Sequence, residues 1–329
     1  MKNKYWQCVR GLAILAVVLI HCDTTADRPF QTMDGTYYLF VRNLYSFAVS
    51  GLFFLSGMFV KPVLEKSFVS RRLKRLLIPY LLWTGFYMMF NLALGGRYTA
   101  YNLVITLLTG KAAMPFYYTI VLSYFVVLTP LLRKAMERKY AVWIVLLSTP
   151  FLVGVGYLVQ YWTGSAGWIK LTPIWIAFYF SGMLVGSGRW KVKIQRKTAV
   201  ILWIAAYLVQ VTGCYCLLMN TRLSDIAFSQ WHITAYLYAA ATIFLFLAFA
   251  KTEWTNSALA YIGDVSYGIY FVHCFFISCF SAVWSRLGIV LPLCLTRSIR
   301  FAFTMIGSLL VLCVLNKILP SQWKKYWGI

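Results

Sequence analysis

The sequence predicts an all-α, polytopic integral membrane protein, and three observations lead to this fold class. Hydrophobic residues make up 61% of the 329 positions, whereas charged residues make up only 12%. A soluble globular chain carries about 25% charged residues, and no soluble domain of this size can bury so much apolar side chain. The apolar positions also fall into runs of about 20 residues, the length that a helix needs to cross a bilayer. Intrinsic disorder, a small secreted disulfide scaffold and a cytosolic enzyme are therefore excluded.

Ten apolar runs follow one another along the chain, and each predicts a membrane-spanning helix. They lie near residues 6–23, 44–61, 76–95, 115–132, 140–159, 172–188, 198–218, 231–250, 262–284 and 290–318. The loops between them are short and leave no room for a soluble domain. We therefore expect a single transmembrane domain over residues 1–329, with about ten transmembrane helices and a tilted or partly interfacial last helix.

The charges in the loops predict the orientation of the chain. The net charge is +23, from 31 Lys and Arg against 8 Asp and Glu. The basic residues gather in alternate loops, which the positive-inside rule assigns to the cytoplasm. These clusters are Lys61, Lys66, Arg71, Arg72, Lys74 and Arg75; Arg133, Lys134, Arg138 and Lys139; and Arg189, Lys191, Lys193, Arg196 and Lys197. Both termini are thus expected in the cytoplasm, and the distribution argues against nucleic-acid binding.

The first apolar run carries the clearest functional signal. An ionisable side chain in the hydrocarbon costs at least about 2.5–3.5 kcal/mol on insertion scales, so each one requires an explanation. Arg10 and His21 are eleven residues apart, close to three helical turns and about 16 Å, so they share one face of a helix. Each could simply mark a membrane interface. Their common face instead favours a groove that holds an anion at one end and moves a proton at the other.

Other polar residues have both a structural and a functional interpretation. Asp23 could orient the His21 ring or only solvate the following loop. Arg72 and Arg75 share a helical face and form a fork suited to phosphate, although any cytoplasmic loop gathers such residues. The ninth run holds a polar stripe that either joins helices by hydrogen bonds or lines a site. Its members are Ser266, Tyr270 and His273.

Two more ionisable residues are expected outside the hydrocarbon. His232 stands at an aromatic-rich start of a run and is expected at the interface, and Arg297 is counted with the outer loops.

Several motifs of known chemistry are absent from the sequence. It contains no HExxH motif, Walker A loop, GxGxxG pattern or lipase-type GxSxG elbow. We therefore expect no metal site and no serine-nucleophile chemistry, and the 8 cysteines read as small apolar residues.

Five stretches along the chain share an order and spacing that is specific, although each alone is mostly apolar. They are Arg10-Gly11 to His21, Gly51 to Phe59, Arg72-x-x-Arg75 before Pro79, Phe116-Tyr117 to Pro130, and Ile262 to His273. Together they resemble the membrane-bound acyltransferase-3 family over nearly the whole chain, the first being similar to its Arg-x10-His signature. Two positions depart from the family pattern, Gln7 in place of Asp and Phe116-Tyr117 in place of Trp-Phe. The sequence stops at Ile329, so the stand-alone form without an extracellular hydrolase-like domain is expected.

The resemblance implies a membrane O-acyltransferase. Such proteins transfer an acyl group, commonly acetyl, from a cytoplasmic acyl-CoA to a hydroxyl of a glycan, wall polymer or lipid-linked sugar. Arg10, Arg72 and Arg75 would bind the CoA phosphates, and His21 would act as general base or briefly carry the acyl group. The acceptor-side candidates are Asp23, Ser266, Tyr270 and His273. No bound cofactor is expected, and a bacterial plasma membrane fits the short basic loops.

A transporter or flippase for a polysaccharide or lipid-linked glycan is the alternative function. Ten spans with a few intramembrane polar groups suit transport equally well. Inverted repeats with broken helices at matching places would favour transport, and the sequence shows no convincing internal repeat.

Overall fold

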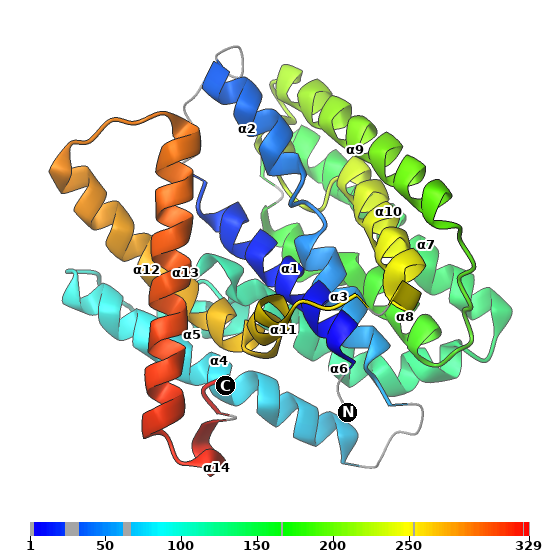
Figure 1. Ribbon diagram of the computed structural model, residues 1–329, viewed down its shortest axis with the longest axis horizontal. Helices are drawn as coiled ribbons and strands as arrows, with labels where there is room; N and C mark the ends of the chain where they lie inside the picture. Colours follow the sequence, from blue (N-terminus) through cyan, green and yellow to red (C-terminus); the bar gives the residue numbers. More distant parts are fainter. Residues whose placement is uncertain are drawn as a thin grey trace. The chain divides into compact units, whose positions relative to one another are not determined.

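The computed structural model describes residues 3–23, 33–61, 67–165, 167–252, 254–324 and 326–328, and these residues form helices and no strand (Figure 1). The all-α, polytopic fold class is therefore confirmed. The α-helices are α1 (Lys4–His21), α2 (Met33–Asn43), α3 (Ala48–Met58), α4 (Phe68–Ala93), α5 (Ala100–Thr109), α6 (Tyr117–Ala135), α7 (Lys139–Thr163), α8 (Ile176–Gly186), α9 (Arg196–Met219), α10 (Ile233–Phe249), α11 (Ser257–Asp264), α12 (Ser266–Leu287), α13 (Leu293–Ile318) and α14 (Ser321–Lys324).

Eight helical stretches of the described chain are long and apolar enough to cross a membrane. They are Gly35–Met58, Phe68–Ala93, Met114–Ala135, Lys139–Thr163, Arg196–Met219, Ile233–Thr252, Ser266–Leu287 and Leu293–Ile318. The expected spans at α1 and α8 are not among them, because α1 carries Lys4 and Arg10 in 18 residues and the α8 segment covers only Pro173–Gly186. The count of ten and the cytoplasmic termini stay predictions.

Three helix boundaries differ from those expected. The run at 44–61 begins in the turn that separates α2 from α3, and the run at 262–284 is interrupted at Val265 between α11 and α12. Helix α4 begins at Phe68 and not near residue 76, so the basic stretch belongs to the helix. Arg and Lys are good helix formers, and no Gly or Pro precedes Pro79 in this segment, so nothing there stops the helix.

The chain divides into two compact units that each draw on distant parts of the sequence. The first unit holds residues 1–16, 26–64 and 128–263, and the second holds residues 17–25, 65–127 and 264–329. Helix α1 contributes its first part to one unit and its last part to the other.

Glycines allow the helices of the first unit to pack closely. A Cβ at Gly57 of α3 would collide with the Tyr179 carbonyl oxygen, and one at Gly182 or Gly186 of α8 would collide with carbonyl oxygens of α3. Gly182 and Gly186 form a small-xxx-small pattern, which lets two helix backbones approach each other in a membrane. The stretch that begins at Gly51 therefore contains a packing contact at Gly57.

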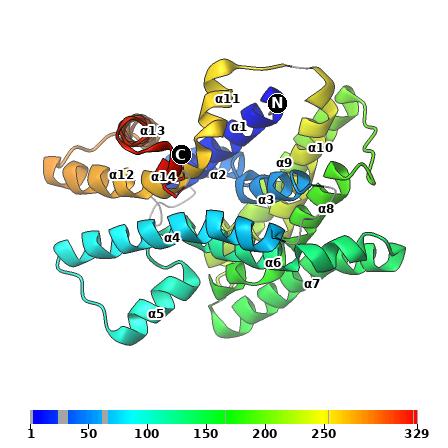
Figure 2. The ribbon, with the colours of Figure 1, turned by 90° about the horizontal axis from the view of Figure 1, so that it is seen from below.

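In the second unit, tyrosine hydroxyls tie the helices together. The Tyr87 hydroxyl of α4 donates to Phe271 O (2.8 Å) and accepts from the Phe275 N–H (2.9 Å), both on α12. The Tyr80 hydroxyl donates to Leu107 O (2.7 Å), which holds α5 against α4 where it folds back (Figure 2). Helix α12 also packs along α13. These contacts form the frame in which the end of α1 is held.

Candidate active site

The candidate site is built around two imidazoles of the second unit. His21 is the last residue of α1, and His273 lies in the second turn of α12. Their ring centroids are 5.5 Å apart, with the ring planes inclined at 42°. His21 is half-buried, and His273 is fully buried. The structure therefore brings together a residue predicted to be catalytic and one predicted only as a possible acceptor-side group.

The ring of His273 is held by its own helix. Its Nδ1 lies 3.0 Å from Ile269 O, and its Nε2 lies 3.5 Å from the Cys274 sulfur. A carbonyl oxygen only accepts hydrogen bonds, so Nδ1 carries the proton and Nε2 of the neutral ring keeps its lone pair. This arrangement fixes the face that His273 presents to His21.

An ion pair anchors the chain just after His21. The Arg297 Nε lies 2.9 Å from the Asp23 Oδ1, and both side chains are only 3% exposed. Another Arg297 nitrogen donates to Leu19 O at 3.3 Å. Leu19 precedes His21 by two residues and Asp23 follows it by two, so one guanidinium holds the chain on both sides of the imidazole.

Arg300 adds a second clamp from α13. It donates to Cys22 O (3.4 Å) and to the Ser281 hydroxyl (2.9 Å), and its guanidinium carbon lies 5.3 Å from the centroid of the Phe280 ring. Arg297 and Arg300 lie three residues apart on α13, and each donates a hydrogen bond to a main-chain carbonyl oxygen at the end of α1.

The sequence analysis missed both arginines. It placed Arg297 with the outer loops, which is wrong, because Arg297 lies in the second turn of α13 and is 3% exposed. Arg300 stands three residues later on the same helix face. The sequence did contain a signal, because both arginines fall within the apolar run at 290–318. An ionisable side chain within such a run is costly in lipid and requires an explanation, as was argued for Arg10.

The comparisons with known proteins decide the family. A family model described as an acyltransferase domain of the acyltransferase-3 type matches residues 3–317 of this chain. The chain belongs to the acyltransferase-3 family. The recognition from the five sequence stretches is thereby confirmed, and the protein is a membrane acyltransferase that uses an acyl donor and an acceptor. Neither curated proteins nor solved structures gave a match.

In this acyltransferase, the other residues of the α12 stripe serve helix packing. The Tyr270 hydroxyl donates to Pro115 O (2.9 Å) and lies 3.0 Å from the Thr119 hydroxyl. Tyr270 and Ser266 are both buried, at 4% and 8% exposure. The interhelical hydrogen bonds left open as one interpretation of the stripe are therefore present for Tyr270, and His273 is the stripe residue whose ring contact with His21 was described above.

The arginines predicted for acyl-CoA binding are divided between the two units. Arg10 is half-buried in the first unit, with its guanidinium carbon 5.5 Å from the centroid of the Phe59 ring. Arg72 and Arg75 lie three residues apart on α4 in the second unit, where Arg72 stacks over Phe68 at 5.7 Å and Arg75 is exposed. Their common role in binding CoA stays a prediction.

His232, which was expected at the membrane interface, stands at the beginning of α10 with its side chain enclosed by protein. It is fully buried in the first unit, where its Nε2 lies 3.2 Å from the Gln210 amide nitrogen and its Nδ1 lies 3.0 Å from the Thr234 hydroxyl. The Thr234 hydroxyl donates to the Gln210 carbonyl oxygen at 2.8 Å, which closes a ring of three side chains. The Gln210 amide nitrogen also donates to Asn43 at 2.8 Å. A polar partner on α9 thus offsets the burial of the imidazole.

Proposed function

We propose that this membrane acyltransferase transfers an acyl group, acetyl in the first instance, from a cytoplasmic acyl-CoA to a hydroxyl. The acceptor class is a cell-surface glycan, wall polymer or lipid-linked sugar, and the membrane is a bacterial plasma membrane. The observation that carries the proposal is the position of His21, which lies 5.5 Å from His273 and is bracketed by the two arginines of α13. Acyl transfer to an alcohol needs a base near neutral pH, and imidazole is the side chain best matched to that task.

Two routes use the same imidazole. In the first, a ring nitrogen of His21 takes the proton of the acceptor hydroxyl while the oxygen attacks the thioester carbonyl. The C–S bond then breaks, and the CoA thiolate receives the proton. In the second, the unprotonated His21 nitrogen attacks the thioester carbonyl, and CoA leaves as a thiolate that takes the proton of the other ring nitrogen. The acceptor hydroxyl then attacks the acyl-imidazole, and its proton returns to the ring. Both routes build negative charge on the carbonyl oxygen, and hydrogen-bond donors aimed at that oxygen stabilise such charge.

The other predicted residues take supporting roles in the proposal. Asp23 pairs with Arg297 and so holds the end of α1, and His273 presents a fixed ring to His21. Arg10 lies at the other end of α1, on the same helix face as His21 by the helical period. Arg10, Arg72 and Arg75 supply positive charge for the polyanionic donor.

The test is transfer of labelled acetyl from acetyl-CoA by the purified full-length protein to lipid-linked sugars or polysaccharide fragments. Wild-type protein should label the acceptor hydroxyl, and His21→Ala should not. Full transfer by His21→Ala would contradict the assigned chemistry. Flux of a glycan across vesicles by the wild-type protein without any acyl-CoA, together with no labelling, would instead favour the transport alternative.

A further inference from the structure

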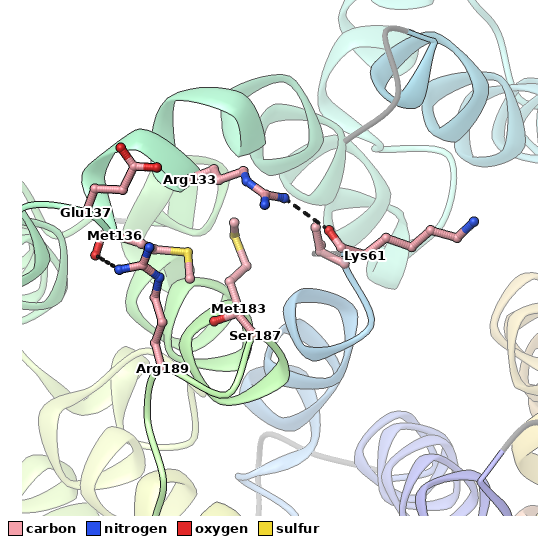
Figure 3. Close-up of a pocket in the computed structure, with 8 residues that line it drawn as sticks. Lys61, Arg133, Met136, Glu137, Met183, Ser187 and Arg189 are labelled. Carbon is pink, nitrogen blue, oxygen red and sulfur yellow. Dashed lines mark hydrogen bonds between the residues drawn. The ribbon is translucent and has the colours of Figure 1, made fainter. Parts of the chain in front are cut away.

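A basic pocket opens in the first unit at the ends of three helices. It has a volume of about 160 Å³ (Figure 3). Lys61 follows α3, Arg133 and Glu137 lie at the end of α6 and just after it, and Arg189 follows α8. The remaining lining residues are Val60, Met136, Met183 and Ser187. The pocket therefore gathers residues from three distant parts of the sequence.

The rim of this pocket is suited to an anion. Arg133 and Arg189 carry two positive charges and Glu137 carries one negative charge, whereas the Lys61 side chain points away from the two arginines and contributes its carbonyl oxygen (Figure 3). Backbone carbonyls fix both arginines, because Arg133 donates to Lys61 O at 3.3 Å and Arg189 donates to Met136 O at 3.1 Å (Figure 3). Each bond uses one of the five N–H donors of a guanidinium, a group whose planar geometry matches phosphate.

The floor of the pocket is apolar and adaptable. Met136 and Met183 are 8% and 4% exposed, and Val60 is also buried. In the view of Figure 3 the two methionine side chains lie between the guanidinium groups of Arg133 and Arg189. A thioether is polarisable and packs well against aromatic rings. A floor of this kind under a basic rim suits a ligand that joins a flat heterocycle to phosphate.

The predicted topology places the pocket on the donor side of the membrane. Lys61, Arg133 and Arg189 come one each from the three basic clusters that the positive-inside rule assigns to cytoplasmic loops. Arg10 stacks on Phe59, which directly precedes Val60 of the pocket. Arg10 of α1 thus packs next to a segment that lines the pocket.

We propose that the pocket binds the phosphorylated adenosine end of the acyl-CoA donor, an inference that rests on the proposed function. Arg133 and Arg189 contact the phosphates, adenine packs on Met136 and Met183, and the Glu137 carboxylate accepts from the exocyclic amine. The assignment adds a phosphate site in the first unit to the positions expected at Arg72 and Arg75.

Calorimetric binding of CoA to the purified full-length protein in detergent tests this assignment. Arg133→Gln and Arg189→Gln should each weaken CoA binding about tenfold, because each substitution removes one guanidinium that donates charged hydrogen bonds to phosphate. Removing the 3′-phosphate from the ligand should weaken wild-type binding and reduce the effect of the substitutions. Arg138→Gln is the matched control, because Arg138 belongs to the same basic cluster but bonds Tyr140 (2.8 Å) and does not line the pocket.

The outcomes separate this inference from the proposed function. Wild-type protein that binds no CoA would defeat the proposed function itself. CoA binding that is unchanged in Arg133→Gln and Arg189→Gln would overturn only the pocket assignment. Weaker binding of short-chain phosphatidylglycerol in these variants, with CoA binding intact, would overturn it in favour of a lipid headgroup. Thermal unfolding of each variant shows whether it is folded.

Discussion

The two buried histidine regions of this protein differ in how their polar groups are satisfied. In the first unit, His232, Gln210 and Thr234 form a closed ring in which both imidazole nitrogens contact a ring partner. In the second unit, Arg297 and Arg300 hold the chain on either side of His21 through Leu19 O, Cys22 O and the Asp23 carboxylate. A closed ring is typical of a structural core, because each bond supports the next and none is left for a ligand.

The arrangement around His21 suits catalysis for a physical reason. Arg297 and Arg300 bind Leu19 O, Cys22 O and the Asp23 carboxylate, so the position of the imidazole is set through the main chain. A reacting group must be fixed in place while its own nitrogen remains able to exchange a proton. The comparison therefore predicts that damage to the second region reduces catalysis, whereas damage to the first reduces stability.

The largest expected difference is between His21→Ala and His232→Asn. Loss of a general base lowers the rate by about 10²–10⁴-fold, so His21→Ala should abolish measurable acetyl transfer. His232→Asn should lower the melting temperature and keep kcat/KM within about twofold, because both nitrogens of the His232 ring already contact the side chains of its own network. Initial rates of labelled acetyl transfer and thermal unfolding of both variants check this. A His232 variant that is folded yet inactive would break the comparison.

The ion pair beside His21 gives the next largest effect. Arg297→Ala leaves the Asp23 carboxylate buried without its partner, which costs about 3–5 kcal/mol. The double variant Asp23→Asn with Arg297→Gln removes both charges and should be more stable than the single variant. If the pair also positions His21, the double variant stays folded but transfers acetyl more slowly. Thermal unfolding and initial rates on the same samples separate these effects, and equal stability of single and double variants would contradict the burial argument.

Much of the fold was predictable because a membrane imposes strong constraints. Apolar runs and charge alternation indicated helices at every expected run, since a chain in lipid must satisfy its backbone internally. The turn between α2 and α3 was not predictable, because residues 44–47 contain no Gly or Pro. The break at Val265 follows Gly263 and Asp264, a turn signal that the prediction of one continuous helix did not use. The apolar composition of a segment predicts that it lies in the membrane, but it does not predict the residue at which the helix ends.

The candidate site was predictable only in part. The helical period placed Arg10 and His21 on one helix, and α1 is continuous from Lys4 to His21. The proximity of His273 to His21 depends on tertiary packing, which a sequence pattern cannot supply. The burial of His232 and Arg297 was not predicted, because a polar residue near the end of an apolar run can face either the membrane interface or a polar partner within the protein. Only the structure shows that partners on α9 and near α1 bury them.

The third prediction probes the closed ring directly. Gln210→Leu removes the partner of His232, Thr234 and Asn43, and each buried polar group left unsatisfied costs about 1–3 kcal/mol. Gln210→Glu is the matched variant, because it keeps the shape and one acceptor oxygen. We expect Gln210→Leu to lower the thermal stability clearly while the KM for acetyl-CoA stays unchanged. A change in KM without loss of stability would show that the ring takes part in substrate binding.

The smallest effect is expected at Tyr270, which shares a helix with His273 but uses its hydroxyl for packing. Tyr270→Phe removes the bond to Pro115 O and the contact with Thr119, at a cost of about 1 kcal/mol. The ring itself remains, and it keeps its stacking against Tyr267 at 5.9 Å. The variant should therefore unfold at a slightly lower temperature and transfer acetyl at nearly the wild-type rate. A loss of activity well beyond the loss of stability would place the Tyr270 hydroxyl in the reaction. The reactive groups of the second unit would then include Tyr270, which lies about one helical turn before His273 on α12.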